Sequence, residues 1–452
     1  MKRIKFPLVI LAAAMGMVSL SAQATNGYFL PGFGIRSMGM GGVGIAFGED
    51  AISAAANPAN LSRVGHRMDI GATLFNPVRT ATVWDRPIVG ADPSTQAGGW
   101  GFHGGGDSSE EIFLMPEFGF AMPLFDGISV GIAMVGNGGM NTTYRDNFFS
   151  FGAIPGQKFP IGVDLMQVLI PLTVAFQPTE NHSFGFSLIP AVQRFAANGL
   201  QAFKAFDASY TITSDPDHLT NKGFDWSMGA GARMGWLGSF FNDRVSLGAT
   251  YSSKIYMSRF EKYQGLFAEQ GDFDIPENWG VGIALKPVKS FVMSYDVMRI
   301  RYSRVASVAN RGPEGWDNSW MAAGIDGIFS TWDPALELGN DLGMGFGWSD
   351  QVVHKFGVQY EVNNKLTVRA GYNYGKSPIA NDQVTFNTLA PAVTEQHYSV
   401  GFTYKLEKDV ELTGFYMYAE QRNQIACGQN IIDCADIGMH QNSLGLNMSY
   451  LF

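Results

Sequence analysis

The chain is poor in charge, and its charge is acidic rather than basic. Asp, Glu, Lys and Arg make up only 16% of its 452 residues, and 40 acidic against 31 basic side chains leave a formal net charge of −9. A nucleic-acid partner, which needs a basic surface, is therefore not expected. Hydrophobic residues make up 46% of the chain, too many for a disordered protein.

Long apolar runs, metal-ligand patterns and cysteines are also scarce. Beyond the first 24 residues, no segment approaches the about 18 apolar residues that a membrane-spanning helix needs. The seven His residues show no metal-ligand spacing, so neither a metal site nor a cofactor is expected. The only cysteines are Cys427 and Cys434. In an exported chain, a pair at this spacing is expected to form a disulfide that closes a small loop.

The first residues indicate export. Lys2, Arg3 and Lys5 are followed by an apolar stretch at 6–20 and by the small-residue site Ala22-Gln23-Ala24. This order is typical of a secretory signal peptide, so residues 1–24 are predicted to be removed.

Glycine is abundant, and apolar residues recur at every second position. The 55 Gly residues are about one in eight, well above the usual ~7%, as in barrels and other β proteins with short turns. The alternation favours about fourteen strands of an outer-membrane barrel. The last strand alone also fits a soluble periplasmic sandwich. The clearest strands lie at 114–122, 184–188, 224–236, 245–251, 279–285, 291–297, 398–404 and 444–452.

Short and long connections alternate between these strands. Strict alternation with both chain ends on the short side is typical of a bacterial outer-membrane barrel, in which the short turns face the periplasm. The fold class is therefore all-β, a transmembrane antiparallel β-barrel spanning residues 68–452 with long extracellular loops. The long links run at 84–111, 138–165, 197–221, 259–272, 301–349, 377–393 and 421–439.

Residues 25–67 differ from the rest. They are Gly-rich, apolar and almost uncharged until Asn57-Pro58-Ala59. Such a segment would form a large apolar patch if it faced the periplasm, so we expect it to fill the barrel lumen as an N-terminal hatch. A mobile periplasmic tail is the alternative.

Several short motifs occur in a fixed order along the mature chain. They are Gly39-Met40-Gly41-Gly42, Asp50-Ala51, Asn57-Pro58-Ala59, Ile275-Pro276-Glu277-Asn278-Trp279, Trp348-Ser349-Asp350, the segment 366–372, Ser377-Pro378 and the final Phe452. In this order they resemble the motifs of the FadL/TodX family of outer-membrane transporters for long-chain fatty acids and other hydrophobic compounds. That resemblance implies a fourteen-stranded barrel plugged by an N-terminal hatch, located in the bacterial outer membrane.

The resemblance also implies a route for the ligand. In such proteins a hydrophobic ligand is caught between extracellular loops, moves to a site near the mature N-terminus and leaves sideways through a gap at a kink in the third strand. The third strand here begins at Ile128, and its continuation Gly136-Asn137-Gly138-Gly139 is poorly suited to a regular ladder. This four-residue segment is compatible either with the lateral gap or with the start of a loop. Candidate ligand contacts are Phe29, Leu30 and Phe33 of the hatch and Phe148, Phe149 and Phe151 of the following loop.

Alternation places Arg233 and Arg369 on the lumen face. Either guanidinium is suited to a fatty-acid carboxylate, whereas lumen charges more often pair with one another. The sequence thus leaves a fatty acid and a neutral hydrocarbon both open. Expected partners besides the ligand are outer-membrane lipid, lipopolysaccharide and, during biogenesis, the barrel-assembly machinery that reads the terminal strand.

An enzyme is not expected. Ser129 stands in a Gly-x-Ser-x-Gly pattern, but it begins a barrel strand instead of the strand-to-helix turn that a nucleophile needs. The prediction is passive uptake of hydrophobic compounds. A structural or adhesive surface barrel with a permanent plug is the alternative.

Overall fold

The computed structural model describes residues 26–85, 104–149, 159–204, 211–312, 333–427 and 433–452. The expected signal peptide, Phe151 and much of several long loops lie outside these ranges. No helix in the described ranges is long and apolar enough to cross a membrane.

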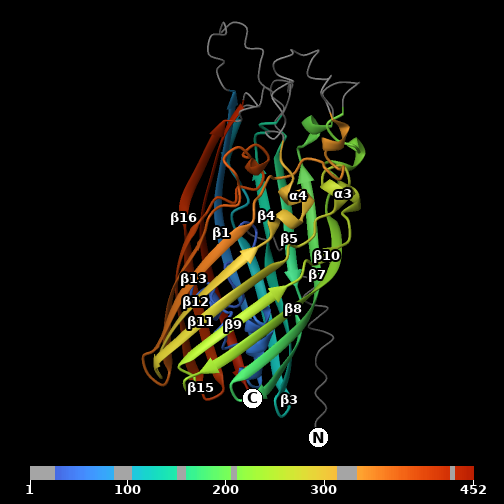
Figure 1. Cartoon of the computed structure of the whole chain (residues 1–452). Helices are drawn as coiled ribbons and strands as arrows, with labels where there is room; N and C mark the ends of the chain where they lie inside the picture. The colour runs from blue at the N-terminus through green and yellow to red at the C-terminus, as the bar shows by residue number, and fades with distance from the viewer. Residues whose placement is uncertain (1–25, 86–103, 150–158, 205–210, 313–332, 428–432) are drawn as a thin grey trace, which may run out of the picture.

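Antiparallel strands close into a single barrel, because the first strand pairs along its whole length with the last (Figure 1). Seventeen strand segments form the fourteen strands of the barrel, because β2 continues β3, β5 continues β6, and β10 continues β9. The expected fourteen-stranded barrel is confirmed. The segments are β1 (Arg67–Asp85), β2 (Gly104–Asp107), β3 (Phe113–Phe125), β4 (Ile128–Tyr144), β5 (Ile161–Leu169), β6 (Leu172–Thr179), β7 (His182–Asn198), β8 (Asp225–Phe240), β9 (Val245–Ser252), β10 (Tyr256–Met257), β11 (Asn278–Val288), β12 (Phe291–Ile300), β13 (Gln351–Glu361), β14 (Leu366–Gly375), β15 (Gln396–Glu407), β16 (Val410–Cys427) and β17 (Asp433–Leu451).

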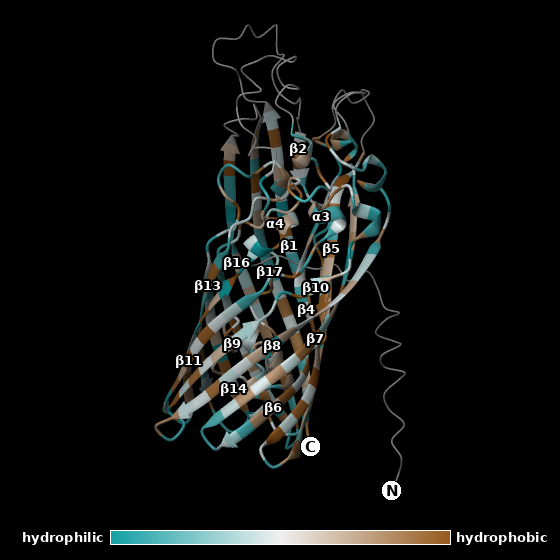
Figure 2. Ribbon diagram, turned by 45° about the vertical axis from the view of Figure 1, so that its right-hand side comes forward, coloured by the Kyte–Doolittle hydropathy of each residue, from teal (hydrophilic) through white to brown (hydrophobic). Residues whose placement is uncertain are grey.

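The period-two pattern is the reason for this arrangement. In β17, Leu444, Leu446 and Met448 face outward, each more than 40% exposed, while the alternating residues Ser443 and Asn447 are buried in the lumen. Figure 2 shows the same alternation of apolar and polar residues along the other strands. Apolar side chains thus face lipid, and small or polar ones face the interior.

Some strands are longer than the sequence pattern predicts. The link expected at 421–439 is largely strand, since β16 and β17 pair up to Cys427 and Cys434, and the link expected at 138–165 is strand at both ends, where β4 runs to Tyr144 and β5 begins at Ile161. The outward face there carries polar residues such as Asn423. The apolar alternation marks only the membrane-embedded part of a strand. The backbone ladder therefore continues beyond the point where the alternation ends.

One section of the wall lacks a ladder. The pairing of β3 with β4 begins at the turn and stops at Phe118 and Met134, and residues 113–117 of β3 then pair only with β1. Above the opening, the amide of Ser109 donates to the carbonyl of Thr143 at 2.9 Å. We call the opening between residues 113–117 and 135–142 the window.

The hatch lies inside the barrel (Figure 1). Short helices cap themselves there: the Asp50 side chain accepts from the amide of Ser53, and the Asn57 side chain accepts from that of Ala59. Isolated turns like these are not stable alone, so wall contacts hold the hatch. The hatch helices are α2 (Ile35–Met38), η1 (Ala51–Ala55) and η2 (Pro58–Arg63).

Helical turns of the long loops fold over the barrel mouth. Buried aromatic and aliphatic residues from these turns form one core with the upper strands. The turns are η3 (Gln201–Phe203), η4 (Pro216–His218), η5 (Glu261–Tyr263), α3 (Ala268–Gly271), η6 (Tyr302–Arg304), α4 (Ala306–Ala309), η8 (Pro334–Leu336) and η9 (Phe386–Thr388).

Candidate functional site

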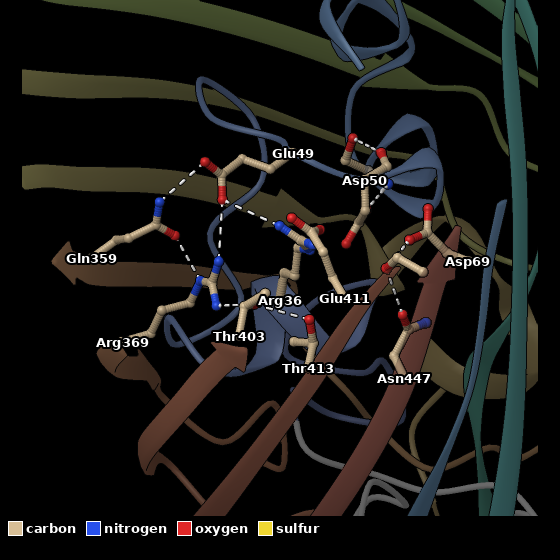
Figure 3. A network of polar contacts seen from close by, with 12 residues as sticks. Arg36, Glu49, Asp50, Asp69, Gln359, Arg369, Thr403, Glu411, Thr413 and Asn447 are labelled. Carbon is tan, nitrogen blue, oxygen red and sulfur yellow. Dashed lines mark hydrogen bonds and ion pairs between the residues drawn. The ribbon is translucent and has the colours of Figure 1, made fainter. Parts of the chain in front are cut away.

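A polar network fixes one side of the hatch to β13, β14 and β15 (Figure 3). Arg369 of β14 donates to Gln359 at 2.7 Å, to Thr403 at 2.7 Å and to the hatch carboxylate Glu49 at 3.2 Å. Its side chain is only 2% exposed, and Glu49 also accepts from Gln359 at 3.0 Å. Arg369 therefore has its charge neutralised by the hatch and serves as a wall anchor.

A second part of the network reaches β1, β16 and β17. Arg36 of the hatch pairs with Glu411. Asp69 accepts from Arg67 at 2.7 Å, from the hydroxyl of Ser449 at 2.6 Å and from the hatch amide of Ala51 at 2.8 Å. Pairing of this kind offsets the cost of burying a charge. The hatch is thus bonded to strands on two sides of the lumen.

The motif Asn57-Pro58-Ala59 anchors the hatch on a third side. The Asn57 amide nitrogen donates to the carbonyl of Ile45 at 2.7 Å and to that of Trp236 in β8 at 3.0 Å. A Cβ on Gly235 would lie 1.9 Å from the Asn57 side-chain oxygen. This wall position therefore requires glycine, because any side chain would exclude the motif.

An apolar cavity lies above the hatch. The space between its lining residues is about 470 Å³, including the part open to solvent, and the lining contains no charged residue and a single hydroxyl, that of Ser307. Such a cavity suits an uncharged ligand or an acyl chain. Its other lining residues are Val163, Phe195, Leu200, Phe203, Leu266, Phe267, Leu338, Met344, Gly345, Phe346, Phe386 and Leu389.

We call this cavity the upper cavity. The N-terminal end of the hatch packs in the same apolar core as its walls. Tyr28 and Phe29 pack against Tyr302 with ring centroids 5.3 and 6.0 Å apart, and Tyr28 also packs against Trp348 at 5.8 Å. Phe29 belongs to the same buried cluster as the cavity walls. The ligand site near the mature N-terminus that the resemblance implies stays a prediction.

The same hatch segment pairs with β4 where the strand is irregular. A register shift falls between Gly136 and Gly138, which leaves Asn137 as an extra residue. The carbonyl of Asn137 accepts from the amide of Leu30 at 3.0 Å, and the amide of Gly139 donates to the carbonyl of Tyr28 at 3.1 Å. The ladder is interrupted by a bulge at Asn137, and β4 continues regularly from Gly138 to Tyr144. A lateral gap at Gly136-Asn137-Gly138-Gly139 stays a prediction.

A second cavity, of about 350 Å³, lies behind the window. It is bounded by Leu30 and Phe33 of the hatch, Met115 of β3, and Val135 and Gly136 of β4, with further residues. The hatch contacts and the glycine segment that the sequence singled out separately therefore meet at one place.

Arg233 differs from Arg369. It is buried, it lies over the ring of Phe33 with its guanidinium carbon 5.6 Å from the centroid, and its Nε and Nη1 atoms have no hydrogen-bond partner among the described residues. An unpaired buried guanidinium is costly. Of the two arginines, Arg233 is thus the one with donors left for a carboxylate.

Phe148 and Phe149 are fully packed in the upper core. Phe149 contacts Phe203 of the cavity wall with centroids 5.1 Å apart, and Phe203 contacts Phe386 at 5.3 Å. The loop residues around Phe386 and Leu389 were missed by the sequence analysis. Their signal was present, since the segment 384–393 is apolar and uncharged.

Cys434 is disulfide-bonded and lies opposite Cys427 in the register of β16 and β17. This is the pairing expected from the sequence. Both positions lie at the outer end of the β16–β17 hairpin.

Comparisons with known proteins place this architecture. Residues 16–436 match the sequence profile of the outer membrane protein transport proteins (OMPP1/FadL/TodX), while no curated protein matches the chain.

Solved structures share the fold at low identity. The toluene transporter TodX of P. putida is 17% identical, with 94% of this chain and 99% of that chain covered and a TM-score of 0.64. A Pseudomonas aeruginosa FadL homologue is 16% identical over 94% and 99%, with a TM-score of 0.64. The Ralstonia pickettii toluene transporter TbuX is 16% identical over the same shares, with a TM-score of 0.59. The chain therefore belongs to the OMPP1/FadL/TodX family of outer-membrane transport proteins for hydrophobic compounds.

Proposed function

We propose that a hydrophobic ligand enters the upper cavity, displaces the aromatic N-terminal end of the hatch, reaches the cavity behind the window and leaves sideways through the wall. The movement is passive. We assign ligand-binding roles to Phe29, Leu30 and Phe33, to Phe148 and Phe149 near the upper cavity, to Phe151, which lies outside the described residues, and to Arg233 where the ligand carries a carboxylate.

The observation that carries this proposal is the coincidence of three features at the window. The β3–β4 ladder stops there, a cavity lined by both strands lies directly behind it, and the hatch segment beside that cavity is bonded to the bulge. A permanent plug needs no such opening. An exit into the membrane also suits an apolar ligand, which never has to cross the periplasmic mouth in water.

The substrate class follows from the cavity walls. The upper cavity has no charged lining residue, so it selects for apolar bulk. Structural relatives are toluene transporters and a FadL homologue, and both neutral hydrocarbons and fatty acids fit these walls. Arg233 is the group that would favour the carboxylate.

The alternative is a structural or adhesive barrel with a fixed plug. Its support is the density of hatch–wall bonds made by Glu49, Arg36, Asp69 and Asn57. Under either function we propose that lipopolysaccharide and outer-membrane lipid surround the barrel and that the assembly machinery reads the strand ending in Phe452.

The test is to remove the bulge. Deletion of Asn137 lets Gly136 and Gly138 continue the regular register with β5, since Gly136 faces Val168 and Gly138 faces Gln167. Uptake of a radiolabelled fatty acid and of toluene by cells should fall at least fivefold. The matched control is Asn137→Ala, which keeps the bulge and loses only the side-chain bond to Gln167. Unchanged barrel-dependent uptake in the deletion variant would overturn the lateral route, whereas uptake by the unchanged chain no higher than in cells without the barrel would favour the fixed-plug alternative.

A further inference from the structure

Three arginines gather on the outer surface where β12 ends. Arg299, Arg301 and Arg304 share two carboxylates, Asp350 and Glu277. We call these three side chains the arginine rim. They take no part in the ligand route.

The arginine side chains of the rim are more exposed than the carboxylates with which they pair. The side chains of Arg299 and Arg304 are 44% and 59% exposed, whereas those of Asp350 and Glu277 are 15% and 17% exposed. Three guanidiniums against two carboxylates also leave an excess of one positive charge. A molecule that approaches from outside therefore meets guanidinium donors first, and each guanidinium carries five of them.

The rim stands at a defined height in the membrane. Tyr251 of β9 is opposite Trp279 of β11, which in turn is opposite Arg299 of β12. Tyr251 and Trp279 are each 41% exposed on the outer face, and aromatic residues at such positions lie at the level of the lipid head groups. Arg299 shares that level.

The surface below the rim is apolar. Two residues further down, Val281 and Val297 lie opposite each other on the outward face, and Val281 is 52% exposed. An occupant that touches both levels needs an anionic head and hydrocarbon chains. This excludes free phosphate and favours a phosphorylated lipid.

A lysine adds a further cation next to the rim. Lys254 donates to the carbonyl of Arg304 at 3.3 Å, pairs with Asp274 at 2.7 Å and stands 5.3 Å from the ring centroid of Tyr256. Tyr256 is 68% exposed. The site thus combines guanidinium, ammonium and aromatic groups at one edge of the lipid-facing surface.

We propose that the arginine rim binds the phosphate of an outer-leaflet glycolipid, with Arg299 and Arg304 as the donors and Arg301 holding the two carboxylates in place. Arginine binds phosphate through paired, charge-assisted hydrogen bonds. The strands β11 and β12 supply the surface for the acyl chains.

The experiment measures binding of a bis-phosphorylated lipid A to the detergent-purified barrel by native mass spectrometry. The double variant Arg299→Gln/Arg304→Gln keeps Arg301 on both carboxylates, so the rim should stay folded. Its affinity should fall tenfold or more, while affinity for the same lipid without phosphates should match that of the unchanged chain. The matched control is Arg311→Gln. Arg311 is equally exposed, but it pairs with Asp382 and belongs to neither the rim nor the strands of Tyr251 and Trp279.

A second variant acts in the opposite direction. Glu277→Gln removes one covered carboxylate yet keeps an acceptor for the Tyr251 hydroxyl, so it should tighten binding of the bis-phosphorylated lipid. The proposal is overturned if the double variant binds that lipid as well as the unchanged chain, or if the unchanged chain does not distinguish the two lipids. Uptake of hydrophobic compounds should be unaffected in all of these variants.

Discussion

Replacing each of the two lumen arginines by methionine should separate a hatch anchor from a ligand group. Met keeps most of the side-chain bulk but removes the charge. Arg369→Met breaks three hydrogen bonds, including the ion pair with Glu49. Arg233→Met breaks no hydrogen bond at Nε or Nη1, and loses the contact with the Phe33 ring at 5.6 Å.

The magnitude follows from the partners that remain. Removing one member of a buried ion pair costs about 3–5 kcal/mol. Glu49 is 32% exposed and keeps Gln359 at 3.0 Å and Arg36 at 3.8 Å, so we expect a smaller cost of about 2–3 kcal/mol for holding the hatch. Local opening of the hatch should then become about 30 to 150 times more frequent.

Hydrogen exchange with mass spectrometry measures that opening. Peptides covering residues 41–56 should exchange faster by this factor in Arg369→Met, while strand peptides of β13 stay protected. Arg233→Met should leave hatch exchange unchanged or slower, because it removes an unpaired buried charge. Equal acceleration in both variants, or none in Arg369→Met, would refute the assignment of Arg369 as anchor.

Three further predictions concern the cavity, the hatch packing and a loop. Val163→Phe narrows the cavity of about 470 Å³ and should lower uptake of hydrophobic compounds severalfold without unfolding the barrel, as uptake assays and heat-modified gel mobility will measure. Gly371→Ala places a Cβ 2.0 Å from the backbone nitrogen of Gly41 and should destabilise the hatch by about 1–3 kcal/mol in the same exchange assay, whereas Gly136→Ala, with contacts no closer than 3.8 Å, should be neutral. Burial, reinforced by Asp274, raises the pKa of Asp272 to about 7. Because the folded loop favours the protonated acid, this stabilisation of the loop is present below about pH 4 and is lost as the pH rises through 7. Hydrogen exchange of residues 260–275, corrected for intrinsic rates, should therefore increase over that interval and become pH-independent in Asp272→Asn.

The sequence was sufficient for the membrane-embedded barrel, because lipid imposes a strict alternation on residues such as Leu444, Leu446 and Met448. Outside the membrane that constraint ends, so the outer parts of β16 and β17 could not be recognised from their side chains. The bulge at Asn137 was visible as a local run of glycines.

The roles of the two arginines were beyond the sequence. Alternation places both Arg233 and Arg369 in the lumen, but only the fold brings Glu49, 320 positions away, to Arg369. The upper cavity could not be predicted from the sequence for the same reason. Phe203 and Phe386 belong to different loops and meet only when both loops fold over the barrel mouth.

The measurement that tests the exit route most directly is reversible blocking of the window. In a background with Cys427→Ser and Cys434→Ser, Val135→Cys places a single thiol in the window cavity, and a bulky methanethiosulfonate reagent attaches there through a reducible disulfide. The control is Val281→Cys, exposed on the lipid face of β11.

Uptake of hydrophobic compounds by the labelled Val135→Cys barrel should be abolished and should return on reduction, while labelled Val281→Cys transports throughout. Full uptake by a barrel whose window is shown by mass spectrometry to be labelled would contradict the lateral route.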